Sequence, residues 1–137
     1  MQDVEPTQRM LPTAVGAITL FVDDPKRSKD FYADLFDLSA IYEDEDATTF
    51  RFDNMLVNLL KASAAGDLIA PLVVGEREAR PRFQLTMWVD DADAACADLR
   101  AHGVELLNGP MDREWGVRTA AFADPDGYIW EIAQPLP

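Results

Sequence analysis

The sequence predicts an α+β domain built from two copies of one β-α-β-β-β module. The triplet Val22-Asp23-Asp24 returns as Val89-Asp90-Asp91, an offset of 89 − 22 = 67 residues. Each copy separates a strand-like run from the start of an amphipathic helix pattern. Near the end, Asp124-Pro125-Asp126-Gly127 divides two runs of apolar and β-branched residues, which is typical of a strand, a tight turn and a strand. Because neither module can bury its apolar face alone, we expect a shared core and a curved mixed sheet that borders a cleft.

The first module is expected at residues 13–61, after a polar tail at residues 1–12. Alternation of apolar side chains predicts a strand from Val15 to Val22. Asp24 is a good N-cap and a proline follows it, so a helix should run from about Pro25 to Phe36. Acidic and Asp-Asn turns then separate three strand-like runs, at about 39–44, 47–53 and 55–61.

Glycine and proline interrupt residues 62–82, which predicts a linker or an arm of the kind that forms a lid or an interface. The second module, residues 83–137, repeats the order of the first, with a strand at 83–89 and a helix at 92–102. Gly103 is placed to end that helix in the left-handed conformation. Three more strands are expected near 104–107, 115–123 and 128–134.

Composition excludes several classes of partner. The 137 residues carry 12 basic and 25 acidic side chains, a net charge of −13, which argues against nucleic acid and anionic membranes. The single cysteine, Cys96, can form no internal disulfide, and its position on the predicted helix indicates a small core residue. The N-terminal residues lack a signal-peptide pattern, and no apolar run approaches the roughly 20 residues of a membrane span. These features predict a cytoplasmic protein.

The repeat, the segment Val22-Asp23-Asp24-Pro25, the pair Phe31-Tyr32 and the tail at residues 124–132 together resemble the vicinal oxygen chelate superfamily. That group includes glyoxalase I, methylmalonyl-CoA epimerase, extradiol dioxygenases, fosfomycin-resistance transferases and bleomycin-binding proteins. The resemblance covers about residues 14–135, and it implies the glyoxalase/bleomycin-resistance fold and a homodimer. It does not specify a reaction.

In enzymes of this superfamily a divalent metal is held at four inward-facing strand positions. By register, the resemblance places those positions at Ala17, Asn58, Gln84 and Glu131. Alanine cannot ligate, and the amide oxygens are weak neutral ligands. The only histidine, His102, belongs to the end of the covering helix, which excludes a two-histidine iron site and disfavours the epimerase and transferase sites. A divalent metal on Gln84 and Glu131 alone is disfavoured, so we expect no cofactor.

Glu131 is the main candidate for a functional residue. It falls in a strand whose two faces are both largely apolar, which predicts that the strand is buried on both sides. A carboxylate there needs a partner, because an unpaired buried charge is costly. Either it pairs with a strand neighbour such as Arg118, or it belongs to a ligand or metal site. Alternation gives a provisional cleft lining of Ala17, Thr19, Phe21, Leu56, Asn58, Leu60, Gln84, Thr86, Trp88, Ile129, Glu131 and Ala133. The candidates for ligand binding are Thr19, Phe21, Asn58, Gln84, Trp88, Arg118 and Glu131.

Two functions remain open. The first is metal-independent binding of a small organic molecule, cationic ones included, with Trp88 stacking on it and Glu131 pairing with its charge, as in the bleomycin-binding branch. The second is a glyoxalase-like lyase or isomerase that uses Glu131 as general base or metal ligand. In a plainer interpretation, Phe21 and Trp88 are core residues. The group of Arg113, Trp115 and Arg118 could bind an anion, although isolated arginines on strands are more often cross-strand charge partners.

Overall fold

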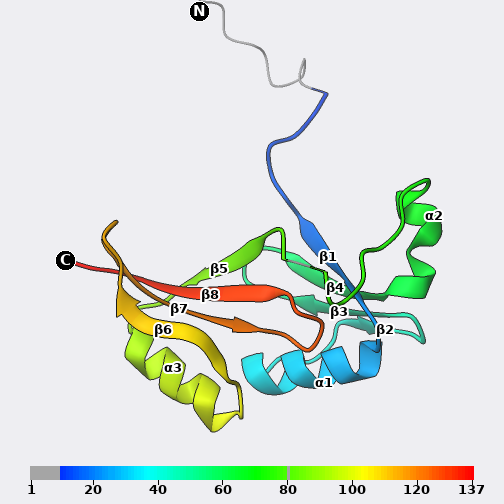
Figure 1. Cartoon of the computed structure of the whole chain (residues 1–137). Helices are drawn as coiled ribbons and strands as arrows, with labels where there is room; N and C mark the ends of the chain where they lie inside the picture. Colours follow the sequence, from blue (N-terminus) through cyan, green and yellow to red (C-terminus); the bar gives the residue numbers. More distant parts are fainter. Residues whose placement is uncertain (1–9, 80) are drawn as a thin grey trace, which may run out of the picture.

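A computed structural model describes residues 10–79 and 81–137, and it shows two modules of the same topology, drawn in Figure 1. The expected tail at residues 1–12 lies largely outside the described residues. The first module contains one long helix and four strands: β1 (Ala17–Val22), α1 (Pro25–Phe36), β2 (Tyr42–Glu43), β3 (Ala47–Arg51) and β4 (Leu56–Lys61). The second contains β5 (Gln84–Trp88), α3 (Ala92–Ala101), β6 (Leu106–Asp112), β7 (Val117–Ala123) and β8 (Ile129–Pro135).

Each module forms a four-stranded mixed sheet with the same strand order. The order is β1-β4-β3-β2 in the first module, which we call sheet 1, and β5-β8-β7-β6 in the second module, which we call sheet 2. In both sheets the first and last strands of the module are parallel, and the other pairs are antiparallel. The predicted α+β class and the repeat of one supersecondary unit are therefore confirmed.

Both helices begin where the sequence predicts. The side chain of Asp24 accepts hydrogen bonds from the first turn of α1, and Asp91 does the same for α3. Gly103 follows α3 with a φ of 78°, which completes the left-handed C-cap. His102 is the C-cap residue itself and bonds to the Asp98 carbonyl, so it has the helix-terminal position that its sequence context indicates.

One core joins the helix-side faces of the two sheets. Its fully buried members include Leu20 and Phe50 from the first module and Phe122 and Ile132 from the second. Trp130, which is 4% exposed, stacks among aromatic rings of both modules. Because these faces share a core, the opposite faces of both sheets point away from it.

A buried polar network, which we call the latch, ties α1 to the β7–β8 turn. Asp124 accepts a hydrogen bond from the Tyr32 hydroxyl, and the indole of Trp130 donates to that hydroxyl at 3.1 Å. Asp126 accepts from the Ser28 hydroxyl at 2.8 Å and from the backbone N–H of Asp23 at 3.0 Å. The turn predicted from the sequence thus also holds the two modules together.

The structure differs from the prediction in several places. β2 has only two residues because the acidic turn begins at once after it. β6 is longer than expected and includes Asn108, Gly109 and Pro110, residue types that typically end a strand. Register shifts on both sides of Asn108 accommodate these residues in an irregular edge strand. Residues 62–69 form two short helical turns, Ala62–Ala64 and α2 (Gly66–Ile69), within the predicted arm.

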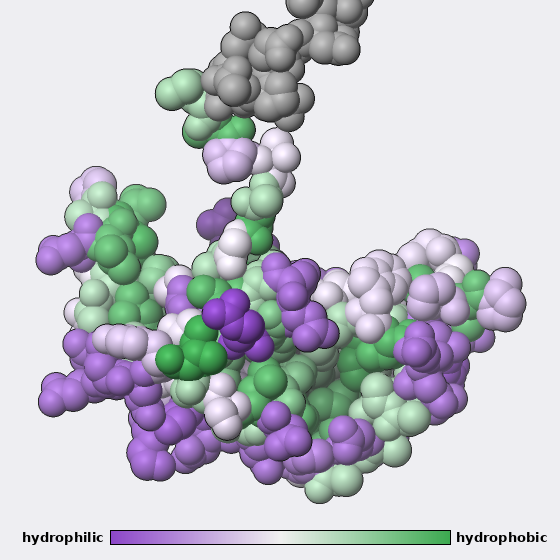
Figure 2. All heavy atoms as spheres, turned by 180° about the vertical axis from the view of Figure 1, so that it is seen from behind, coloured by the Kyte–Doolittle hydropathy of each residue, from purple (hydrophilic) through white to green (hydrophobic). Residues whose placement is uncertain are grey.

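The lobe formed by α2 and the residues after it stands apart from the body, and hydrophobic side chains lie on its outer surface (Figures 1 and 2). Leu68, Leu72 and Val73 are 72%, 72% and 87% exposed. Among the described residues, no helix is long and apolar enough to cross a membrane.

Candidate functional site

The predicted lining residues lie on the outer faces of the two sheets, opposite the core. In sheet 1, Thr19 on β1 is in register with Asn58 on β4. In sheet 2, Thr86 on β5 is in register with Glu131 on β8. The two pairs occupy equivalent places in the repeat. The core lies on the other side of both sheets, so the larger side chains of these faces reach solvent, whereas the small residues Thr119, Ala121 and Ala133 between them are buried.

On sheet 1 a row of three polar side chains crosses the strands. Thr49 donates a hydrogen bond to the Asn58 amide oxygen at 2.8 Å, and the Asn58 amide nitrogen donates to the Thr19 hydroxyl at 3.2 Å. The structure therefore brings the predicted residues Thr19 and Asn58 together. Their mutual bonds fix the orientation of the amide on the open face.

On sheet 2 the carboxylate of Glu131 is half-buried. The Thr86 hydroxyl donates to Glu131 Oε1 at 3.1 Å, and Oε2 has no hydrogen-bond partner among the residues that the structure describes. Ala121 of β7 and Ala133 of β8 are the small neighbours of Glu131 on this face. A cationic or hydrogen-bond-donating group of a ligand could approach this carboxylate oxygen.

Arg118 does not join this site. It lies on the helix side of β7, where it donates to Asp93 of α3 and to Asp112 of β6 at 2.9 Å each. These bonds raise the pKa of Arg118 further above its usual value and hold it charged. The alternative in which Arg118 pairs with Glu131 is therefore wrong. Its assignment to ligand binding stays a prediction, and the structure does not bring its side chain to the face that carries Glu131.

The other predicted residues are spread along the open faces. Trp88 is 68% exposed on β5, so the interpretation of this side chain as core is wrong for the single chain. Gln84 is exposed at the start of the same strand. Phe21, at the end of β1, is half-buried and lines a separate pocket.

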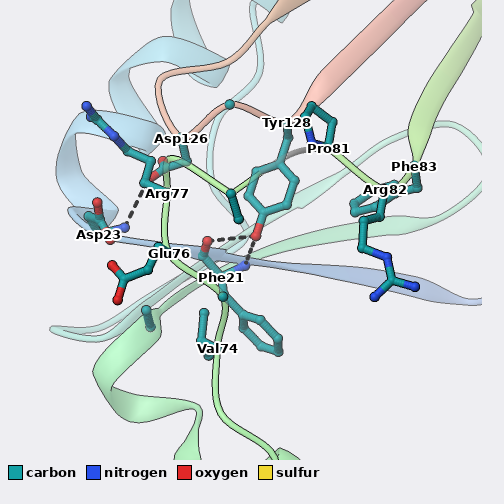
Figure 3. Close-up of a pocket in the computed structure, with 14 residues that line it drawn as sticks. Phe21, Asp23, Val74, Glu76, Arg77, Pro81, Arg82, Phe83, Asp126 and Tyr128 are labelled. Carbon is teal, nitrogen blue, oxygen red and sulfur yellow. Dashed lines mark hydrogen bonds between the residues drawn. The ribbon is translucent and has the colours of Figure 1, made fainter.

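That pocket, which we call the junction pocket, lies where the two modules and the arm at residues 62–82 meet (Figure 3). Its volume is about 240 Å³. Phe21, Phe83 and Tyr128 form aromatic walls, and the arm contributes Val74 and Pro81. Charged side chains lie at its edge: Asp23, Glu76, Arg77 and Arg82.

Beneath the junction pocket, Tyr128 of the second module bonds to β1 of the first module, at a contact that we call the seam. Its hydroxyl accepts from the backbone N–H of Phe21 at 3.0 Å and donates to the Phe21 carbonyl at 2.8 Å. Burial raises the pKa of Tyr128, which keeps the hydroxyl protonated and able to donate. The hydroxyl occupies the place that a neighbouring strand would have on the free edge of β1.

Sequence reasoning does not find the role of Tyr128 and does not decide that of Arg113. Tyr128 was assigned only to a strand face, and no local pattern shows that its hydroxyl reaches a strand 107 residues away in the chain. For Arg113 the sequence leaves two roles open, anion binding and cross-strand charge pairing. The structure places it on the outer face of sheet 2, where it donates to Thr119 Oγ1 and Asn108 Oδ1. Cys96 is buried as predicted, and burial raises the pKa of its thiol.

The donor set does not fit a divalent metal. Of the four positions that the resemblance implied, Ala17 has no donor atom and Asn58 is already bonded to two threonines. Gln84 is in register with Ile129 and not with Glu131, so the amide and the carboxylate are two residues apart along the strands. Within residues 10–79 and 81–137 no three His, Cys, Asp or Glu side chains are grouped as metal ligands. A single carboxylate with a neutral amide is a weak site.

Comparison with known proteins agrees with this fold. The model of the Glyoxalase/Bleomycin resistance protein/Dioxygenase superfamily matches residues 14–132. The chain belongs to this superfamily. It is also 34% identical over 123 residues to the uncharacterized protein YraH of Bacillus subtilis (strain 168), which covers 87% of this chain and 96% of YraH.

Solved structures share the architecture. A glyoxalase-related enzyme from Fulvimarina pelagi superposes with a TM-score of 0.76 at 24% identity, over 90% of this chain and 88% of that one. TnmS3, an antibiotic binding protein from Streptomyces sp. CB03234, superposes with a TM-score of 0.69 at 25% identity, over 93% of this chain and 99% of that one. The same fold therefore occurs in an enzyme and in an antibiotic binding protein.

Proposed function

We propose that this superfamily member binds a small organic molecule, cationic ones included, on the open faces of its sheets without a resident metal. The observation that carries the proposal is the environment of Glu131. Its carboxylate is half-buried and bonded once by Thr86, and it shares its face with the exposed indole of Trp88. The plainest structural role for this carboxylate is an ion pair with a neighbouring arginine. Arg118 does not fill that role, because the Arg118 side chain bonds to Asp93 and Asp112.

A carboxylate beside an aromatic face is well suited to an aromatic amine or amidine. The carboxylate would accept charge-assisted hydrogen bonds, and the indole would stack on the ring. The net charge of −13 favours the approach of cations. The resemblance to TnmS3 supports a binding role, because that protein binds an antibiotic.

The same proposal includes a homodimer in which a second copy closes the site. Large apolar side chains are exposed on the outer face of sheet 2 and on the α2 lobe, among them Trp88, Leu72 and Val73. A sheet face with exposed aromatic residues typically covers itself by association. Light scattering at micromolar concentration should give twice the chain mass of 15.3 kDa. A monomer would refute this part of the proposal.

Calorimetric titration tests the binding role. Metal-stripped wild type, Glu131→Gln and Glu105→Gln would be titrated with bleomycin, acriflavine and benzamidine. We expect at least one of these to bind, and Glu131→Gln to weaken it about tenfold by removing the charge. The exposed Glu105 lies outside the outer face of sheet 2, so its variant should behave as wild type. Equal affinities for wild type and Glu131→Gln would contradict the assignment.

Metal analysis tests the proposal that the protein holds no resident metal. The protein would be exposed to Ni, Zn, Co, Mn and Fe(II), exchanged into buffer and analysed by plasma mass spectrometry. We expect little retention, because the donor set is weak. Near-stoichiometric retention would contradict the proposal and favour the lyase or isomerase alternative with Gln84 and Glu131 as ligands.

A further inference from the structure

We propose that Arg113 forms an anion-binding subsite on the same face as Glu131, so that the preferred ligand is a small zwitterion with an amine and a carboxylate. This inference rests on the proposed function and narrows it. It concerns the outer face of sheet 2 alone.

Register places the two charges on one face. Glu131 pairs with Ala121, and Ala121 pairs with Asn108, so a row of side chains runs from β8 across β7 to β6. The adjacent row contains Ala133 and Thr119. Paired residues of neighbouring antiparallel strands share a face, so all of these lie opposite the core. Arg113 lies at the β6 side of this surface, where it bonds to Thr119, a residue that is 2% exposed.

Arg113 is held in place by neutral partners. Its Nε donates to Thr119 Oγ1 at 2.9 Å, and its Nη2 donates to Asn108 Oδ1 at 3.1 Å. The ring of Trp115 lies 5.9 Å from its guanidinium carbon. These contacts use two of the five N–H groups. Within the described part of the chain, the remaining three, on Nη1 and Nη2, have no acceptor, and they form the fork that binds a carboxylate at two points.

Arg113 and Arg118 differ in their partners. Arg118 has carboxylate partners in Asp93 and Asp112, whereas no carboxylate of the described residues lies within salt-bridge distance of Arg113. The side chains of Arg51, Arg82 and Arg100 also have no carboxylate partner among the described residues, but they are exposed. Arg113 is half-buried and fixed by two side-chain hydrogen bonds, so it is preorganised to bind an anion. Its position on the face of Glu131 points to the ligand as the source of that anion.

The sheet sets the size of the ligand. Glu131 on β8 and Asn108 on β6 are two strand spacings apart, roughly 10 Å between backbones. Only the small side chain of Ala121 lies between them in the row. A rigid molecule with its amine at Glu131 and its carboxylate at Arg113 would lie across this floor, beside the exposed indoles of Trp88 and Trp115. An aromatic ring between the two charges suits these walls.

A matched set of three probes tests the inference: 4-(aminomethyl)benzoate, benzylamine and 4-methylbenzoate. Calorimetry would give their affinities for wild type, Arg113→Gln, Glu131→Gln and the control Arg118→Gln, whose side chain lies on the other face of β7. We expect wild type to prefer the zwitterion about tenfold over either singly charged probe. Arg113→Gln should reduce zwitterion binding to the level of benzylamine, and Arg118→Gln should leave it unchanged.

The Nε–H resonance of Arg113 in wild-type protein gives a second readout that needs no variant to fold. It should shift with 4-(aminomethyl)benzoate and 4-methylbenzoate and not with benzylamine. Two results together would overturn this inference and leave the proposed function intact. Benzylamine affinity would fall in Glu131→Gln, and the preference for 4-(aminomethyl)benzoate over benzylamine would be the same in wild type and Arg113→Gln. Failure of all three probes to bind at millimolar concentration would also overturn it. Conversion of a dimer to a monomer by Arg113→Gln would instead assign Arg113 to the contact between copies.

Discussion

Replacement of Tyr32 by phenylalanine should strongly destabilise the protein, because its hydroxyl is the centre of the latch. The hydroxyl donates to the Asp124 carboxylate and accepts from the Trp130 indole, and neither group has another side-chain partner among the described residues. Asp124 is 5% exposed and Trp130 4%. Asp124 Oδ1 would keep its bonds from the backbone N–H groups of Asp126 and Tyr128, but Asp124 Oδ2 and the Trp130 indole N–H would each lose a partner without gaining water.

Leaving a buried donor or acceptor unpaired costs about 1–3 kcal/mol, so two such groups cost about 2–6 kcal/mol. For a chain of this size each kcal/mol lowers Tm by about 3–5 °C, so the fall should be at least about 6 °C. Urea unfolding followed by circular dichroism, with calorimetry for Tm, would measure both quantities. Tyr42→Phe is the matched control, because Tyr42 is exposed and bonds only to the nearby Asp44.

The effect should also depend on pH. Burial raises the pKa of Asp124 above its ordinary value of 3.8. A carboxyl group with a raised pKa in the folded state contributes stability that is fully present below the unfolded pKa and is lost as pH rises through the folded pKa. The Tyr32 hydrogen bond opposes this shift, so its removal raises the pKa of Asp124 further. Tyr32→Phe should therefore be more destabilising near neutral pH than at about pH 4. A loss below about 1 kcal/mol, or one independent of pH, would refute the account of the latch.

Three further predictions concern other parts of the fold. A Cβ at Gly109 would overlap the Thr119 carbonyl oxygen and lie 2.8 Å from the Ala120 Cα, so Gly109→Ala should cost more than about 3 kcal/mol by urea unfolding. Gly103→Ala meets nothing within 4 Å and should cost only about 1 kcal/mol; equal losses would contradict the packing argument. Tyr128→Phe removes both hydrogen bonds to the edge of β1, so hydrogen exchange at the Phe21 amide should accelerate while exchange at the Leu59 amide stays slow. Unchanged exchange at Phe21 would contradict the role of Tyr128 in protecting that edge. The hydrogen bond to the Asp98 carbonyl raises the pKa of His102, so its NMR titration should have a midpoint above 6.5, and a midpoint below that value would contradict the bond.

The sequence was most informative where local chemistry repeats. The N-caps Asp24 and Asp91 and the glycine after α3 located both helices, because capping depends on neighbours within one turn. The turn at residues 124–127 located the last hairpin for the same reason. Alternation also placed Thr86 and Glu131 on one face, and their hydrogen bond follows from strand pairing.

Contacts between distant segments could not be predicted in this way. Arg113 and Arg118 are both strand-proximal arginines in an acidic chain, and only the twist and register of β6 and β7 send them to opposite faces. The hydrogen bond from Tyr128 to β1 and the junction pocket depend on how the modules pack. Local patterns carry no information on that packing.

The most direct test of the central claim is the location of a bound small molecule in solution. Metal-stripped, 15N-labelled protein would be titrated with benzamidine, and amide and indole shifts would be followed. The account predicts the largest changes at Thr86, Glu131 and the Trp88 indole, on the outer face of sheet 2. Changes confined to the junction pocket, at Gly75, Phe83 and Gly127, would contradict it and assign ligand binding to the seam between the modules.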